Sequence, residues 1–253
     1  MITTVVFDLD DTLYDEIDYC RSGFASVAEF LVYRASSISA GRLTAEHQAS
    51  AEDIFDVLWK QFHAGNRKNT FNTALDELGI EYDDNLIQEL INIYRNHVPK
   101  ITLPDDSRDV LSQLSSKYTL ALLTDGFLPA QQLKVQALGI ERYFKCIIYT
   151  EQLGREFWKP SPVGFEKLMR TLNARAENIA YIADNEKKDF IAPNKLGFLT
   201  IQVIRPARIH TKSSPPASSP LSCLTKEDKR GAGAAAQYII YEISQLPALL
   251  ARL

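Results

Sequence analysis

The chain has 253 residues, of which 45% are hydrophobic, enough to bury a sizeable core in one large domain or two smaller ones. Its 32 acidic and 28 basic residues give a net charge of −4 without a long basic run, which excludes the usual signature of a nucleic-acid or membrane partner. No apolar run reaches the roughly 18 residues of a membrane span. Three widely spaced cysteines without a metal-binding pattern predict a reduced, cytoplasmic protein.

The first predicted element is a strand over residues 2–7, which are mostly β-branched and apolar. A continuous apolar run of this length is typical of a parallel strand that is buried on both faces. Directly after it the chain places Asp8, Asp10 and Asp11 within four positions. Carboxylates this close raise one another's pKa, so such a cluster is expected where a cation or a reacting group compensates the charge.

Residues 14–103 show helical periodicity and no convincing strand. Apolar residues with the spacing of one helix face occur in two groups: Ile54, Val57, Leu58 and Phe62, and Leu86, Leu90, Ile93 and Tyr94. The pattern predicts a helical domain, residues 14–103, inserted into a core that is formed by residues 1–13 and 104–253.

Short strand-like runs resume after the insertion and alternate with helix-like segments. They cover residues 118–124, 145–150, 178–184, 199–204 and 237–243. This alternation predicts right-handed βαβ units in a doubly wound parallel α/β sheet. Residues 205–236 are rich in Pro, Ser, Gly and Ala, a composition that predicts a flexible loop between the last two strands.

Four segments place polar side chains at predicted strand ends or helix starts, where open parallel sheets bind their ligands. They contain Asp8 and Asp10; Thr124, Asp125 and Gly126; Lys159; and Asp184 and Asp189. Any one of these segments alone could be an ordinary turn or a solvated part of the surface. Together and in this order, they predict a single site.

In these motifs the chain resembles the haloacid dehalogenase (HAD) superfamily, whose members carry DxDxT, a Ser or Thr after an apolar strand, a Lys, and an acidic pair. The resemblance covers essentially the whole chain outside residues 205–236. One departure is Ala183, which stands where many members have Gly before the acidic residue. The resemblance implies a Rossmann-like α/β core with an inserted helical cap and the activity of the phosphatase branch.

The resemblance also implies roles for the acidic residues. Asp8 would be the nucleophile that forms an aspartyl-phosphate, and Asp10 the acid and base that serves the leaving group and then water. Mg²⁺ would be held by Asp8, Asp184 and the backbone carbonyl of Asp10. Asp189 would orient a metal-bound water or Lys159. The ion would explain why the chain tolerates the carboxylate cluster.

The remaining residues would bind the substrate's phosphoryl group. By the same resemblance, Thr124 and backbone N–H groups near Asp125 and Gly126 would contact the phosphoryl oxygens. Lys159 would offset the charge of Asp8 and of the phosphate.

These residues predict a Mg²⁺-dependent phosphatase that acts on a small phosphorylated metabolite, a nucleotide monophosphate or a sugar phosphate, as a monomer or homodimer. A phosphomutase shares all four motifs and stays open, as does an inactive HAD-fold protein that only binds a partner. A dehalogenase is disfavoured because its members lack an acid/base residue at the position of Asp10. A signalling receiver would be much shorter and would lack the insertion.

Overall fold

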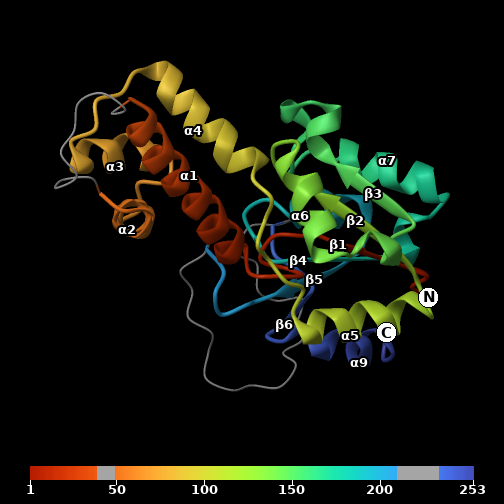
Figure 1. Cartoon of the computed structure of the whole chain (residues 1–253). Helices are drawn as coiled ribbons and strands as arrows, with labels where there is room; N and C mark the ends of the chain where they lie inside the picture. Colours follow the sequence, from red (N-terminus) through yellow and green to blue (C-terminus); the bar gives the residue numbers. More distant parts are fainter. Residues whose placement is uncertain (39–48, 210–233) are drawn as a thin grey trace. The chain divides into compact units, whose positions relative to one another are not determined.

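The computed structural model of the chain describes residues 1–38, 49–209 and 234–253 (Figure 1). It divides into two compact units. One consists of Met1–Ile17 and Thr102–Leu253, and the other of Asp18–Ile101. Each unit is described by itself below.

The first unit is built on a parallel sheet, and its strands in the described residues are β1 (Thr4–Phe7), β2 (Thr119–Thr124), β3 (Cys146–Tyr149), β4 (Ile179–Ala183), β5 (Leu199–Val203) and β6 (Tyr238–Ile240). Their order is β3-β2-β1-β4-β5-β6, and every neighbouring pair is parallel. Each strand falls within a run predicted from the sequence, so the doubly wound parallel sheet is confirmed. The strand order changes direction at β1, which creates the crevice where such sheets bind ligands.

Helices cover this sheet. They are α5 (Asp105–Ser115), α6 (Ala130–Leu138), α7 (Val163–Leu172), α8 (Ile191–Leu196) and α9 (Leu246–Leu250). Phe165 of α7 meets Tyr181 of β4 edge to face, with ring centroids 5.0 Å apart. The same apolar cluster includes Val6 of β1 and Ala192 of α8, so α7 and α8 cover one face of the sheet. Helices α5 and α9 lie side by side (Figure 1).

The second unit is helical, with most of α1 (Glu16–Ile38), α2 (Ala51–His63), α3 (Thr70–Leu78) and α4 (Asp84–Asn96). Its core is aromatic, because the ring of Phe24 lies 5.5 Å from Phe62 and 5.3 Å from Tyr94. Ser50 caps α2 through its side chain, which accepts a hydrogen bond from the Asp53 backbone N–H. The unit lies within the predicted insertion, and its action as a cap stays a prediction.

The predicted flexible loop at 205–236 lies mostly outside the described residues, which end at 209 and resume at 234. Among the helices that the structure describes, none is long and apolar enough to span a bilayer.

Candidate active site

The sheet register brings three of the predicted motifs to one edge. Phe7, the last residue of β1, pairs with Leu122 of β2 on one side and with Ile182 of β4 on the other. The residues just beyond, Asp8 and Asp184, therefore lie next to each other, and the Asp8 backbone N–H donates to the Ile182 carbonyl at 2.9 Å. The adjacent strand β2 ends at Thr124.

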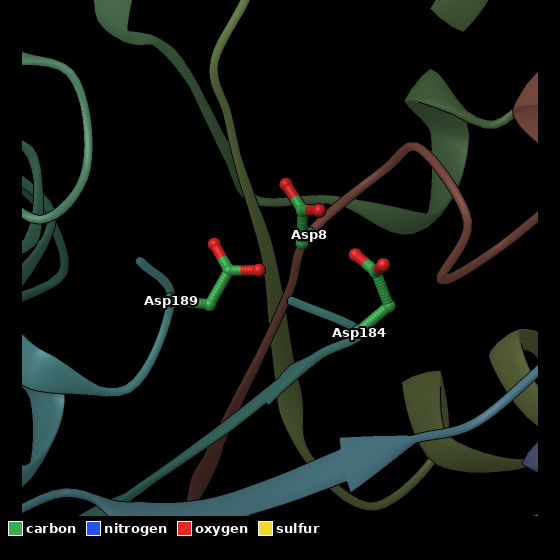
Figure 2. A group of neighbouring side chains, drawn as sticks. All are labelled: Asp8, Asp184 and Asp189. Carbon is green, nitrogen blue, oxygen red and sulfur yellow. The ribbon is translucent and has the colours of Figure 1, made fainter. Parts of the chain in front are cut away.

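Three buried carboxylates point toward a common space: Asp8 from the loop after β1, and Asp184 and Asp189 from the segment after β4 (Figure 2). One oxygen of each lies within 4.8 Å of the others. Burial, and then the charge of Asp8, raises the pKa of Asp184 to about 9. Burial likewise raises the pKa of Asp8, against the lowering effect of Lys159.

This cluster fits a hard divalent cation. Within the described parts of the chain, the Asp184 Oδ2 atom is buried and accepts no hydrogen bond. A buried carboxylate oxygen without a donor is costly unless a cation compensates it. Mg²⁺ prefers oxygen ligands of this kind. Asp8 and Asp184 would hold such an ion, as the sequence implied, whereas Asp189 also contacts Lys159.

Lys159 lies at the centre of the charged cluster. Its Nζ atom is 2.7 Å from the Asp8 Oδ1 atom and 2.7 Å from the Asp189 Oδ1 atom, the second contact being an ion pair rather than an aligned hydrogen bond. It also donates to the Tyr181 hydroxyl at 3.2 Å. Burial works to lower the pKa of Lys159, but Asp189 and Asp8 raise it well above its usual value, so the ammonium stays charged.

The side chain of Asp125 stabilises the position of Lys159. Its carboxylate accepts hydrogen bonds from the Lys159 backbone N–H at 3.2 Å and from the Thr150 hydroxyl at 2.7 Å. Lys188, which the sequence interpretation did not use, has its Nζ 3.3 Å from the same carboxylate. The Asp125 carboxylate is thus occupied by protein groups. A role in phosphate binding would belong to its backbone N–H.

Asp10 lies apart from the three-carboxylate cluster. Its side chain accepts hydrogen bonds from the Tyr14 hydroxyl at 2.6 Å, from Gln131 Nε2 at 2.7 Å and from Lys134 Nζ at 2.9 Å. Gln131 Nε2 also donates to the Thr124 hydroxyl at 3.0 Å. The predicted acid/base residue and the predicted phosphate-binding threonine are therefore connected through helix α6.

Gly126 allows this connection. Its φ of +140° is one that residues with a side chain rarely adopt. A Cβ atom at this position would lie 2.6 Å from Gln131 Nε2. The glycine therefore leaves room for Gln131 to reach Thr124 and Asp10.

Sequence reasoning missed the polar residues that surround the predicted ones: Tyr14, Gln131, Lys134, Tyr181 and Lys188. A signal existed for two of them. Gln131 and Lys134 are three positions apart on α6, beside Val135 and Leu138, and all four are buried. Polar residues on the apolar side of a predicted helix indicate a buried polar partner.

The acidic cluster is expected to affect the stability of the metal-free protein in a pH-dependent way. The folded state keeps a proton on Asp184 up to a pKa of about 9, whereas the unfolded chain releases it near 3.8. Because the folded state then binds more protons, this residue costs stability increasingly as the pH rises from 4 to 9. We expect Asp184→Asn to remove that cost. Each pKa unit is worth about 1.4 kcal/mol, so a single unit of the shift predicts a Tm increase of about 3–6 °C at pH 8 for a protein of this size.

Thermal unfolding in EDTA at pH 4.5 and pH 8, for wild type and Asp184→Asn, measures this effect. The difference between the two proteins should be small at pH 4.5 and large at pH 8. Saturating Mg²⁺ should raise the Tm of wild type at pH 8 more than that of the variant. An Asp184→Asn protein that is less stable than wild type at pH 8 without metal would contradict the prediction.

The doubly wound parallel sheet places the strand-end Asp8 and its buried partner Lys159 at the switch point, where α/β proteins of this class bind their ligands. The chain belongs to the haloacid dehalogenase-like hydrolase family, whose model matches residues 2–197. The resemblance predicted from the four motifs is thereby confirmed.

Relatives and solved structures agree with this assignment. The glyceraldehyde 3-phosphate phosphatase of Methanopyrus kandleri is 28% identical over 211 residues, which cover 81% of this chain and 85% of that protein. The human N-acylneuraminate-9-phosphatase is 23% identical, covering 98% of this chain and 94% of that protein. The structure of the putative HAD-hydrolase YfnB from Bacillus subtilis bound to magnesium superposes with a TM-score of 0.61 at 23% identity, covering 98% of each chain. The chain is therefore a HAD-family hydrolase, and both of these named relatives are phosphatases.

Proposed function

We propose that this enzyme hydrolyses the phosphate ester of a small sugar-type metabolite, depends on Mg²⁺ and proceeds through an aspartyl-phosphate. The observation that carries the proposal is the buried cluster in which Asp8 lies 2.7 Å from Lys159 and within 4.8 Å of Asp184 and Asp189. The two phosphatases described above act on phosphorylated carbohydrate-like compounds, by their names, which supports this substrate class over nucleotides.

In the first step an Asp8 carboxylate oxygen bonds to phosphorus while the bond between phosphorus and the ester oxygen breaks. Asp10 gives its proton to the departing oxygen. In the second step Asp10 takes a proton from water, whose oxygen bonds to phosphorus and releases Asp8 and inorganic phosphate. Lys159 stabilises the charge on Asp8 and on the phosphoryl group throughout.

Mg²⁺ would be held by Asp8, Asp184 and the backbone carbonyl of Asp10, where it supplies charge neutralisation for the carboxylates and the phosphate. Thr124, at the end of β2, and the backbone N–H groups of Asp125 and Gly126 bind the phosphoryl oxygens. The helical unit, which is inserted directly after the loop that follows β1, acts as the cap that selects the leaving group.

Phosphate release from a substrate panel tests the proposal. The panel contains glyceraldehyde 3-phosphate, N-acylneuraminate 9-phosphate, a nucleoside monophosphate and 4-nitrophenyl phosphate, each with Mg²⁺ or with EDTA. We expect release that requires Mg²⁺, returns when the ion is restored after chelation, and is fastest with a sugar-type substrate.

Three results would contradict it. Release that is unchanged in EDTA would remove the metal from the proposal. Preference for the nucleotide would overturn the substrate class. Transfer of phosphate between positions of a sugar without net release would identify a phosphomutase.

A further inference from the structure

Lys134 is a buried charged residue to which the proposed reaction assigns no role. It lies on α6 and is 4% exposed. Its Nζ atom contacts both carboxylate oxygens of Asp10, at 2.9 Å and 3.0 Å. The Glu16 Oε1 atom lies 3.5 Å away. Burying an ammonium is costly unless acidic partners compensate it, so this position is a specific arrangement rather than a chance surface contact.

The Asp10 carboxylate is held by three side chains. The Tyr14 hydroxyl donates to Oδ1, and Gln131 Nε2 donates to Oδ2. Lys134 contacts both oxygens, so each carboxylate oxygen has one neutral donor and a share of the ammonium. Donors on both oxygens restrict rotation of the carboxylate about its bond to the Cβ atom. Lys134 contributes the charged contact, the strongest kind of donor.

We propose that Lys134 is a positioning residue that fixes the Asp10 carboxylate in the orientation from which it transfers protons. The inference rests on the proposed role of Asp10 as acid and base. Lys134 touches neither the substrate nor the phosphoryl group in this scheme. It acts through Asp10, whose proton transfers require a narrow geometry.

The two steps of the reaction need Asp10 to different degrees, and this difference provides the test. An alkyl ester leaves as an alkoxide, so it needs the Asp10 proton when its bond to phosphorus breaks. An aryl ester such as 4-nitrophenyl phosphate leaves as a stable phenolate without a proton. Hydrolysis of the aspartyl-phosphate requires Asp10 to take a proton from water, whichever ester was used. A misplaced Asp10 therefore slows the second step for both esters, and the first step mainly for the alkyl ester.

The experiment compares wild type, Lys134→Met and the control Lys195→Met, which removes an exposed lysine from α8 in the same unit. Rapid mixing with 4-nitrophenyl phosphate and Mg²⁺ measures nitrophenolate, and acid quenching of ³²P-labelled substrate measures the phosphoenzyme. For Lys134→Met we expect a burst of nitrophenolate, an accumulated phosphoenzyme and a steady-state kcat lowered by about 10- to 100-fold. This is less than the roughly 10²- to 10⁴-fold of general acid–base catalysis, because Asp10 itself is still present. The KM of an alkyl substrate should change little while its kcat falls.

The outcomes separate the inference from the function on which it rests. Asp10→Asn with wild-type kcat would overturn the role of Asp10 itself. If Asp10→Asn is inactive and Lys134→Met keeps the kcat of wild type, only the inference is overturned. A loss of kcat in Lys134→Met without a burst or accumulated phosphoenzyme would also overturn it.

If Lys134→Met fails to fold, Lys134→Met/Glu16→Gln takes its place, because the second change neutralises Glu16, an acidic neighbour of the lysine. The same burst and the same loss of kcat are expected from it, and their absence counts against the inference. Lys134→Arg, which keeps the charge, should recover part of the kcat. Lys195→Met should match wild type.

Discussion

Asp8→Asn is expected to lower kcat with the best substrate of the panel by about 10⁴-fold or more, as removal of a catalytic nucleophile does in other covalent mechanisms. The amide keeps the size of the carboxylate but is a poor nucleophile for phosphorus. The folded protein should persist, since the change removes one charge from a cluster of mutually repelling carboxylates. Phosphate release and acid-quench trapping of ³²P-labelled enzyme measure the two consequences.

The control for this variant is Asp109→Asn, which makes the same chemical change at an exposed position of α5. It should retain wild-type activity. Labelling of Asp8→Asn to the wild-type extent, or a kcat within about tenfold of wild type, would exclude Asp8 as the nucleophile.

Lys159→Met should have the second-largest effect, lowering kcat by about 10³-fold, the scale of losing one preorganised electrostatic contact to the reacting group. The substitution also leaves Asp8 and Asp189 buried without their shared cation. Breaking a buried ion pair in this way costs about 3–5 kcal/mol of stability. A Tm decrease of about 10 °C is expected for a protein of this size.

A double variant separates the two effects of Lys159. In Lys159→Met/Asp189→Asn one of the two unpaired carboxylates is neutral, so the Tm should recover substantially. Activity should stay low, because no cation then stabilises the phosphoryl group. Recovery of activity together with the Tm would show that Lys159 contributes to the reaction only by maintaining the fold.

The sheet and the positions of the motifs could be predicted from the sequence because they depend on local patterns. The run that contains Val5 and Val6 is apolar at every position, and β1 is buried on both faces between two neighbours. Once parallel strands are assigned, their carboxyl ends share an edge, which brings Asp8 and Asp184 together without further information.

The partners of Asp10 could not be predicted in the same way. The sequence indicates a helix-like segment between the strands predicted at 118–124 and 145–150, but it does not fix the rotation of that helix against the sheet. The contacts of Gln131 and Lys134 with Asp10 depend on that rotation and on the close approach that Gly126 permits. The contacts of Asp125 with the Lys159 backbone N–H depend likewise on the path of the loop before α7.

The register of β1 has a consequence for how the protein is made. Thr4 pairs with Thr119 on one side and with Ile179 on the other, so β1 is synthesised before either of its neighbours: β2 follows only after the helical unit, and β4 later still. The apolar segment that precedes Asp8 stays exposed during that interval, and pairings this distant in sequence form slowly. Asp8 is thus translated well before the two other carboxylates of its cluster. A nascent chain that stops before β4 contains Asp8 but lacks Asp184 and Asp189.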